Sequence, residues 1–473
     1  MRDGADELSF AQLREQVYAV ARRLLERGCA REPVGVYAGR TVDVICAMLG
    51  AAAAGCCYVP LNPTVPADKN HKILADAGAR IVIGMDGTEY DGADLGCEYM
   101  LYSHKSTPGC AERPEAAIDG RDTLYLIYTS GSTGAPKGIR KSHGAQVDFI
   151  EAYVREFGFT ADEVIGNQSP FSADASAKDL YLMLAAGATL EIIPTRLFSF
   201  PVQLVEYLNE KKITFVSWVP SALAIVARLR TFRDVKPLYL RRVYFVGEVF
   251  PARDLAGWRE AVPDADYVNL YGSSEIAGIA CYYRLPKGEP VPDPLPIGRP
   301  LPNCRVYLGH DGVIDGGEQG EIMIESAALA DEYIGNPEKT AAVFCTAEID
   351  GRKRRVLRTG DMARRDSDGK LVYLSRDDGM IKYKGYRIEL GEIEAAVSAL
   401  DFVVRCCCLY DAVRERITVF LSTTRPELKL RELNEALGGT LPDYMLPKRL
   451  VLMDELPLNP NGKIDRALLK SKL

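Results

Sequence analysis

The sequence predicts an α/β protein with a large N-terminal domain and a small α+β C-terminal domain. The large domain is expected to contain two parallel α/β subdomains and a small β-rich subdomain. Three observations predict this architecture. Apolar, strand-like runs alternate with helix-length segments from about residue 10 to about residue 300. Pro, Gly and Asp separate shorter strands from about residue 285, and a compact strand–helix pattern follows residue 376. With 473 residues, 47% of them hydrophobic, the chain can bury a core for two or three domains.

The N-terminal alternation of strands and helices favours parallel sheets with helices on both faces. Ligands of such sheets bind beyond the carboxyl ends of the strands. We expect strands at 56–59, 79–84, 123–128, 189–193, 214–218, 242–246 and 266–270. We expect helices at about 41–54, from about 142, at 199–211 and at 220–229.

Shorter elements make up the rest of the chain. The β-rich subdomain is expected to contain strands at 305–309, 320–325, 354–360 and 370–376. The C-terminal unit is expected to contain strands at 380–384, 403–410 and 417–422 and helices at 392–400 and 430–437. We therefore predict a large domain at 1–377 and a small domain at 378–473.

Composition narrows the class of protein. The net charge of −7 and the pI near 5.5 argue against nucleic acid as the main partner. The twelve cysteines include adjacent pairs but no C-x-x-C, so we expect reduced thiols and no zinc site. Val44–Leu61 is uncharged for 18 residues, but Gly55 and Pro60 interrupt it, so we expect a buried helix and a strand and no membrane insertion. The N-terminus lacks a signal-peptide pattern, and we expect a cytoplasmic monomer.

The segment Tyr128–Gly138, YTSGSTGAPKG, follows a strand-like run and contains three glycines, four hydroxyl residues and one lysine. A helix is expected from about Ser142. A loop between a strand and a helix presents backbone N–H groups and a helix N-terminus to an anion. The segment therefore predicts a nucleotide-phosphate site, although its composition alone is equally typical of a surface turn.

The full string resembles the phosphate loop of the adenylate-forming (ANL) superfamily. That superfamily includes peptide-synthetase adenylation domains, acyl-CoA synthetases, luciferases and D-alanine–carrier protein ligases. Further motifs follow in the family's order as far as Asp465, and weaker ones precede the loop. The resemblance implies ATP and Mg²⁺ as cofactors and a mobile C-terminal domain. It also implies nucleotide contacts from Thr129, Ser130, Gly131, Ser132, Thr133, Gly134 and Lys137.

Asn269–Glu275, NLYGSSE, resembles the family's N-x-Y-G-P-T-E segment. The resemblance implies that Tyr271 stacks on adenine, Asn269 and Gly272 lie beside the base, Ser274 contacts the α-phosphate and Glu275 holds Mg²⁺. An aromatic ring suits a base, and a carboxylate beside phosphates needs a divalent cation. The alternative reading is a turn with a packed tyrosine.

Three further segments resemble nucleotide and hinge motifs. Gly247-Glu248 is similar to a step whose backbone approaches adenine. Asp361 of the R-T-G-D string is implied to accept hydrogen bonds from ribose, and Arg376 is implied to bind ribose as well. Asp378 aligns with the family hinge. The alternative for Asp361 is an exposed aspartate of a β-turn, and the lysines of the hinge segment, Lys382 and Lys384, are equally typical of a charged surface.

Leu458–Asp465, LNPNGKID, resembles the terminal P-x-N-G-K-[IV]-D motif. The resemblance implies that Lys463 is the mobile catalytic lysine, acting with Glu275 and Ser274. A lysine after Asn-Gly is otherwise typical of a solvated turn.

Ser172–Asp179, SADASAKD, resembles a stretch of amino-acid adenylation domains in which the aspartate pairs with the substrate α-ammonium. Asp174 would then bind the substrate, whereas its alternative role is the N-cap of a helix starting near Ala175. Lys178 lies on the same predicted helix face and could either reach an acidic side chain of the substrate or neutralise Asp174 or Asp179. The other implied pocket positions are Ala175, Ser217, Tyr244, Val246, Leu270, Gly278 and Ile279.

The resemblance implies a two-step ligase. An amino acid would react with ATP to give aminoacyl-AMP and pyrophosphate, and the thiol of a separate phosphopantetheinylated carrier protein would then accept the aminoacyl group. Lys178 argues against D-alanine as the substrate, because the D-alanine ligases lack this lysine. An acyl- or aryl-CoA ligase, or a non-catalytic nucleotide-binding relative, remains an alternative.

Overall fold

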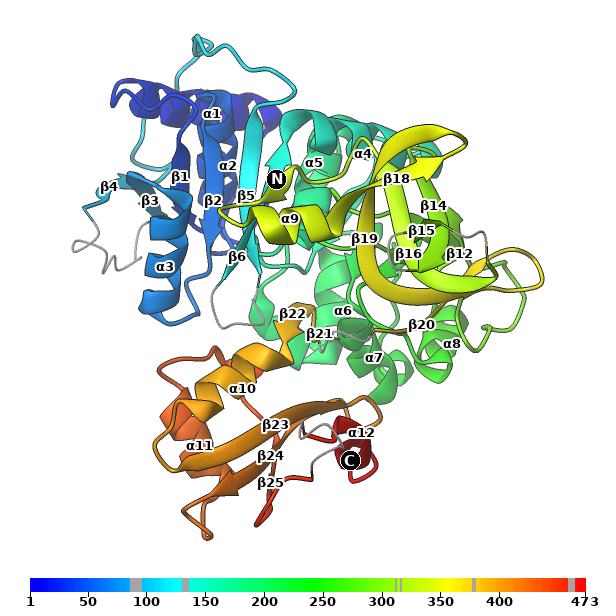
Figure 1. Ribbon diagram of the computed structural model, residues 1–473. Coiled ribbons are helices and arrows are strands. Elements are labelled where there is room, and N and C mark those ends of the chain that lie inside the picture. The colour runs from blue at the N-terminus through cyan, green and yellow to red at the C-terminus, as the bar shows by residue number, and fades with distance from the viewer. Residues whose placement is uncertain (86–95, 130–135, 311–312, 315–316, 377–379, 458–463) are drawn as a thin grey trace. The chain divides into compact units, whose positions relative to one another are not determined.

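The chain forms two compact units in the computed structural model, which describes residues 1–85, 96–129, 136–310, 313–314, 317–376, 380–457 and 464–473. Unit 1 comprises 1–62, 74–127 and 138–375, and unit 2 comprises 63–73, 128–137 and 376–473. Helices and strands alternate along most of unit 1 (Figure 1).

The first sheet is largely parallel. Its strand order is β17-β6-β5-β2-β1-β3-β4, in which β2, β1, β3, β4 and β5 pair in parallel and β17 pairs antiparallel with β6. The bounds are β1 Pro33–Tyr37, β2 Cys57–Leu61, β3 Ile81–Met85, β4 Glu98–Tyr102, β5 Thr123–Thr129, β6 Lys137–Ser142 and β17 Glu332–Tyr333. The helices near this sheet in sequence are α1 Phe10–Leu25, α2 Val42–Ala53 and α3 Ala67–Ala77.

The second sheet has the order β13-β12-β11-β10-β9-β7-β8, with parallel pairing from β11 to β8. Its strands are β7 Val164–Asn167, β8 Thr189–Ile192, β9 Phe215–Trp218, β10 Arg242–Val246, β11 Asp266–Tyr271, β12 Cys281–Arg284 and β13 Arg299–Pro300. Its helices are α4 His143–Phe157, α5 Ala175–Ala186, α6 Pro201–Glu210, α7 Pro220–Arg228 and α8 Ala252–Ala261.

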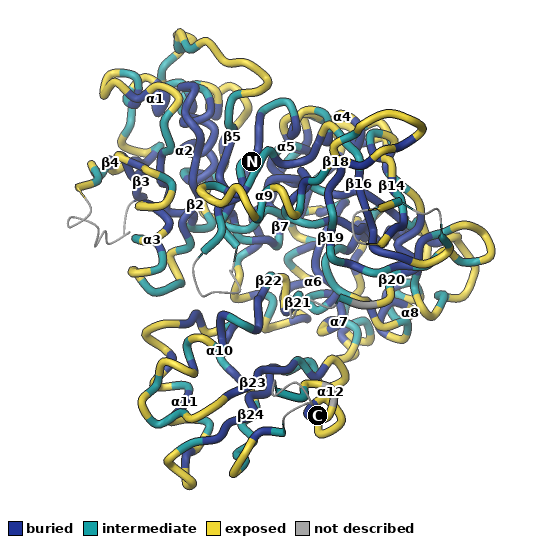
Figure 2. The backbone as a smooth tube through the Cα atoms, viewed as in Figure 1, coloured by how far each residue is buried: buried dark blue, intermediate teal, exposed yellow. Residues whose placement is uncertain are grey.

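Alternating side chains of β10 show how the second sheet is covered. Tyr244 belongs to one buried cluster, which it shares with residues of α4 and α5 and of the first sheet. Val243 and Phe245 belong to another cluster, built with residues of α6, α7 and α8. Because successive residues of a strand point to opposite faces, helices cover both faces of this sheet, as expected. The strands are accordingly among the most buried parts of the chain (Figure 2).

A third, antiparallel sheet forms the β-rich part of unit 1, with the order β15-β14-β16-β19-β18 and β20 paired to β19. Its elements are β14 Cys304–His310, β15 Val313–Ile314, β16 Gln319–Ser326, α9 Pro337–Val343, β18 Phe344–Ile349, β19 Arg352–Arg365 and β20 Leu371–Arg376.

The C-terminal part of unit 2 is an α+β module with its own buried core. It contains β21 Met380–Tyr383, β22 Tyr386–Glu389, α10 Leu390–Ser398, β23 Val403–Asp411, β24 Arg416–Thr423, α11 Leu430–Leu437, β25 Arg449–Leu452 and α12 Arg466–Lys470. The predicted boundary between residues 377 and 378 lies outside the described residues and stays a prediction.

The fold class is therefore confirmed, with one local correction. The phosphate-loop segment was expected to lead from a strand into a helix N-terminus, but β6 follows it, and α4 begins only after β6. In β6 the side chains of Ile139 and Lys141 are buried while Arg140 between them is partly exposed, and Ile139 pairs with Tyr333 of β17. This pairing makes the segment a strand despite its three basic residues.

The uncharged stretch Val44–Leu61 forms most of α2 and all of β2, as expected. Among the residues that the structure describes, no helix is both long and apolar enough to span a bilayer.

Candidate active site

Two predicted nucleotide residues meet in unit 1. Tyr271 is the last residue of β11 and Asp361 lies within β19, and both side chains are buried. The Tyr271 hydroxyl donates a hydrogen bond of 2.6 Å to Oδ2 of Asp361. Burial, and then the Asp361 carboxylate, raise the pKa of the Tyr271 phenol well above its ordinary value, so the hydroxyl stays protonated and donates.

The loop after Tyr271 depends on two glycines. A Cβ atom at Gly272 would lie 2.4 Å from the carbonyl oxygen of Gly278, so only glycine allows this approach. Gly278 has φ +82°, and a Cβ atom there would lie 2.1 Å from the ring of Phe149. The tight reversal places Ser274 and Glu275 between the two glycines.

Glu275 is buried and is held from two directions. The Tyr333 hydroxyl donates a 2.6 Å hydrogen bond to Oε1 of Glu275, and the backbone N–H of Ala330 donates to the Glu275 carbonyl at 2.9 Å. Tyr333 lies in β17, so the strand that closes the first sheet also orients this carboxylate. Ser274 is half-buried.

The side chains of two other predicted residues form hydrogen bonds with backbone groups. Asn269 Nδ2 donates to the carbonyl of Pro296 at 2.7 Å. Glu248 accepts a hydrogen bond of 2.9 Å from the N–H of Ser221, in the first turn of α7. Gly247 has φ +101°, a conformation that favours glycine. These contacts fix the backbone after β10 and β11, at the carboxyl ends of the strands.

Asp174 has an internal partner that the sequence reading did not identify. Lys141 of β6 is completely buried, and its Nζ lies 2.7 Å from Asp174 Oδ1 and 2.9 Å from the carbonyl oxygen of Ile276. The Tyr125 hydroxyl donates to the same carboxylate oxygen at 3.0 Å. Burial raises the pKa of Asp174, and the Lys141 ammonium and the Tyr125 hydroxyl oppose that rise.

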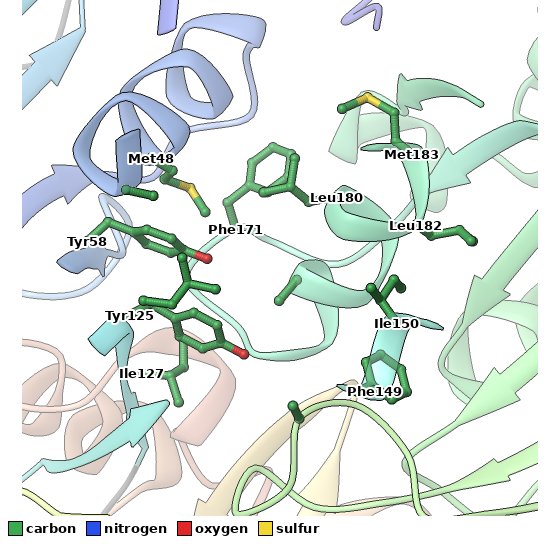
Figure 3. Packing of buried hydrophobic residues seen from close by; sticks show 14 of the residues in the cluster. Met48, Tyr58, Tyr125, Ile127, Phe149, Ile150, Phe171, Leu180, Leu182 and Met183 are labelled. Atoms are coloured by element: carbon green, nitrogen blue, oxygen red, sulfur yellow. The ribbon is translucent and has the colours of Figure 1, made fainter. Parts of the chain in front are cut away.

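Tyr125 belongs to a small array of phenols. Its ring stacks on that of Tyr58 with centroids 5.2 Å apart, and Figure 3 shows both hydroxyls pointing to the same side. The Tyr58 and Tyr181 hydroxyls lie 3.1 Å apart. Asp174 occupies the N-cap position of α5, but its side chain makes no capping hydrogen bond. The capping alternative is therefore wrong for this carboxylate.

Lys178 pairs with its neighbour in sequence. Its Nζ contacts Oδ1 of Asp179, and both side chains are buried. Asn167 Nδ2 donates to the other oxygen of Asp179 at 3.1 Å. Of the alternatives left open for Lys178, this contact corresponds to neutralisation of Asp179.

The remaining predicted pocket residues all belong to unit 1. Ser217 of β9 pairs in register with Tyr244 of β10, and Val246 pairs with Leu270 of β11. Ser217 is buried, and its Oγ has no hydrogen-bond partner among the described residues. The Tyr244 hydroxyl donates to Asp266 at 3.0 Å. Ile279 is buried, whereas Ala175 and Gly278 are partly exposed.

Several predicted residues belong to unit 2 or lie outside the described residues. Thr129 ends β5 and Lys137 begins β6, with Lys137 Nζ 3.7 Å from Glu389 Oε1 within unit 2. Arg376 is half-buried. The residues outside the described part of the chain are Ser130, Gly131, Ser132, Thr133, Gly134, Asp378 and Lys463.

Three residues of the site were missed from sequence: Lys141, Tyr125 and Tyr333. Strand alternation offered one signal, because Lys141 lies two residues after the buried Ile139 and therefore on the same face. No local pattern distinguished the two tyrosines from packed core residues.

Comparison with known proteins identifies the family. A model of AMP-binding enzymes matches residues 1–334, and a model of the AMP-binding enzyme C-terminal domain matches residues 392–463. The first match covers more than half of the chain. The chain belongs to the AMP-binding enzyme family. It is an ANL adenylation domain and an AMP-forming ligase, as the motifs led us to expect.

Individual relatives match this AMP-binding enzyme over nearly its whole length. It is 34% identical to phosphinothricin tripeptide synthetase PhsB of Streptomyces viridochromogenes, a match that covers 99% of the chain but only 40% of that longer protein. It is 32% identical to a D-alanine–D-alanyl carrier protein ligase of Bacillus cereus, over 99% of the chain and 95% of the ligase. The crystal structure of IdnL1 superposes with a TM-score of 0.83 and 26% identity, covering 97% of this chain and 95% of that one.

Proposed function

We propose that this AMP-binding enzyme activates an amino acid as aminoacyl-AMP with release of pyrophosphate. The aminoacyl group is then transferred to the phosphopantetheine thiol of a separate carrier protein. One observation carries the proposal: the match to a D-alanine–D-alanyl carrier protein ligase spans 95% of that protein as well as 99% of this chain. The enzyme is proposed to be a cytoplasmic monomer with a mobile small domain at 378–473.

The nucleotide end of the site supports ATP binding. The ring of Tyr271 is proposed to stack on adenine. Its hydroxyl orients the Asp361 carboxylate through a hydrogen bond of 2.6 Å. A carboxylate has about four lone-pair sites, so Asp361 can accept from ribose hydroxyls as well as from Tyr271. Lys137, the serines and threonines of the phosphate loop and Arg376 are proposed to hold the phosphates and the ribose.

The residues present fit Mg²⁺. Glu275 offers a buried carboxylate that the Tyr333 hydroxyl orients. Mg²⁺ is usually held by one or two protein carboxylates together with substrate phosphates and water, so a larger acidic cluster is not required. The bound ion would neutralise phosphate charge. Ser274 and Lys463 are proposed to contact the α-phosphate and the reacting carboxylate.

Most of the protein's own thiols are poorly suited to carry the acyl group. Nine of the twelve cysteines are buried. Burial raises the pKa of Cys46 and that of Cys57 to about 12, so these thiols stay protonated near neutral pH. The proposal therefore assigns no acyl-carrying role to these buried cysteines. The acid is proposed to attack ATP directly, with positioning and charge stabilisation as the protein's contribution.

Pyrophosphate exchange tests the first step. We expect ATP–pyrophosphate exchange with one or a few acids from a panel of D- and L-amino acids and aliphatic and aryl acids. Glu206→Gln, on the exposed surface of α6, serves as the control and should exchange at the wild-type rate. Exchange with aliphatic or aryl acids alone would contradict the amino-acid assignment.

Acceptor choice tests the second step. The purified enzyme is incubated with ATP, the activated acid and either a phosphopantetheinylated carrier protein or CoA, and thioesters are detected by mass spectrometry. We expect the thioester on the carrier protein. Thioester formation on CoA alone would favour the acyl-CoA ligase alternative instead.

A further inference from the structure

We propose that Lys141 is a specificity-determining residue that acts through Asp174. As an internal counter-ion of that carboxylate, it removes the need for a substrate ammonium group. The inference rests on the proposed function and extends its substrate class: the enzyme also activates 2-hydroxy acids that match its amino acid in side chain and chirality.

The contacts make Lys141 a fixed part of the site. Its Nζ donates to Asp174 Oδ1 at 2.7 Å and to the carbonyl of Ile276 at 2.9 Å, and it lies 5.6 Å from the centroid of the Tyr125 ring. The Tyr125 hydroxyl occupies the same carboxylate oxygen at 3.0 Å. Oδ1 of Asp174 therefore already accepts two hydrogen bonds from the protein.

Asp174 and Lys141 differ in how accessible their side chains are to a ligand. The Asp174 side chain keeps 12% of its surface exposed, whereas Lys141 is 0% exposed. A molecule in the site can therefore contact the carboxylate without contacting the lysine. Lys141 cannot bind the substrate directly, and its influence is exerted through the charge of Asp174.

Charge balance then decides which group Asp174 prefers. Asp174 and Lys141 together carry no net charge, and Lys178 with Asp179 forms a second neutral pair on α5. A substrate ammonium would place a second cation on a carboxylate that already has one, so repulsion from Lys141 offsets much of its attraction to Asp174. A hydroxyl donates a hydrogen bond to the same carboxylate without that repulsion.

Glu275 is the other acidic group that acts on Asp174. In the proposed function its carboxylate faces Mg²⁺ and phosphates, so its charge is balanced at the nucleotide. Lys141 therefore remains the cation that balances the charge of the Asp174 carboxylate.

The test compares amino acids with 2-hydroxy acids. ATP–pyrophosphate exchange is measured for each active amino acid and its 2-hydroxy counterpart with wild type, Lys141→Met and Lys141→Arg. We expect kcat/KM for the two acids to agree within about tenfold in the wild type. In K141M the ratio should shift toward the amino acid by about tenfold or more, mainly through KM, because the pocket then carries a net negative charge. K141R keeps the charge, so the ratio of the two acids should stay closer to that of the wild type than in K141M, although the larger buried side chain can lower both rates.

Arg140→Met is the matched control. Arg140 is the adjacent cation of β6, but its side chain is 39% exposed and lies near Asp331 and Glu332 rather than Asp174. R140M should leave the ratio of the two acids unchanged. An equal shift in R140M and K141M would overturn the inference, since general loss of positive charge would explain it.

A double variant covers the destabilisation expected when a buried carboxylate loses its cation. K141M/D174N has no charge at either position, and it should fold and show little preference between the two acids. If the wild type exchanges the amino acid but rejects the hydroxy acid by more than about a hundredfold, and K141M leaves that ratio unchanged, the inference is wrong while the proposed function stands.

Thermal unfolding of the same variants gives a readout that does not depend on turnover. K141M and D174N should each lower Tm, and the double variant should recover part of the sum of the two losses. In the exchange assay, by contrast, a lack of activity with every acid would mean that the proposed function itself fails. Additive Tm losses would show that Lys141 is not the counter-ion of Asp174 and would overturn the inference by themselves.

Discussion

The hydroxyl of Tyr271 and the carboxylate of Asp361 are joined by a 2.6 Å hydrogen bond, although they lie 90 residues apart in the chain. One residue ends a parallel strand of the second sheet, and the other lies in a long strand of the antiparallel sheet. The contact connects the proposed adenine-binding residue to the proposed ribose-binding residue. Movement of either residue should therefore affect the binding of the other half of the nucleoside.

Removal of the Tyr271 hydroxyl should weaken ATP binding while keeping the aromatic face. In Tyr271→Phe we expect KM for ATP to rise about tenfold, the lower end of what a hydrogen bond to a charged group contributes. ATP titration in the pyrophosphate-exchange assay measures the change. Tyr267→Phe is the control, because the Tyr267 hydroxyl donates to the carbonyls of Trp258 and Val262 and not to Asp361. Equal effects on KM in both variants would contradict the role of the Tyr271–Asp361 contact.

How far the sequence predicted the fold depended on where each element obtains its stability. The strand expected at 242–246 agrees with β10 at both ends, because a run of apolar and aromatic residues buried on both faces has a strong local pattern. The strand β6 was missed because its sequence, KGIRKS, is rich in basic residues. Its pairing with β17 depends on residues almost 200 positions away, which no local pattern reveals.

The site shows the same division. Motif resemblance pointed to Tyr271, Glu275 and Asp361, which the structure brings into one unit. It could not supply Lys141, because the significance of this lysine comes from its contact with Asp174, 33 residues further along the chain. A motif identifies residue types at fixed spacing, whereas an ion pair between two motifs becomes visible only when the sheets are assembled.

Gly278 should be essential for stability. In Gly278→Ala the new methyl group would lie 2.1 Å from the ring of Phe149, at a backbone φ of +82°. Phe149 is completely buried, and Figure 3 shows it among the buried core residues. We expect a loss of about 3 kcal/mol in the free energy of unfolding, from overpacking together with left-handed strain. Urea denaturation measures the loss.

Gly288→Ala separates the two causes. Gly288 has a similar φ of +77°, but a Cβ atom there meets nothing within 4 Å. This variant should lose only about 1 kcal/mol, the cost of a left-handed backbone for alanine. If the two variants were equally destabilised, the contact with Phe149 would not be the cause of the larger effect.

His143, the first residue of α4, should make stability depend on pH. Burial lowers the pKa of its imidazole, and the nearby Asp122 only partly opposes this. Above the ordinary histidine pKa the ring is neutral in both the folded and the unfolded chain. As pH falls below that value the unfolded chain takes up a proton more readily, so the free energy of unfolding should decrease. Chemical denaturation from pH 8 to pH 5 should show a steeper decline in the wild type than in His143→Gln, and parallel curves would contradict the assignment.

Substitution of Lys178 can distinguish neutralisation of Asp179 from contact with an acidic substrate side chain. Lys178 contacts Asp179, and both side chains are buried. If the lysine serves mainly to neutralise Asp179, Lys178→Met should lower the free energy of unfolding by about 3–5 kcal/mol, since it leaves a buried carboxylate unpaired. The double variant K178M/D179N should recover much of that loss, because Asn167 can still donate to an amide oxygen at position 179. The preference among acids in pyrophosphate exchange should then stay as in the wild type. If instead K178M/D179N folds normally but loses exchange with acidic amino acids in particular, the lysine reads the substrate side chain, and its contact with Asp179 describes only the enzyme without substrate.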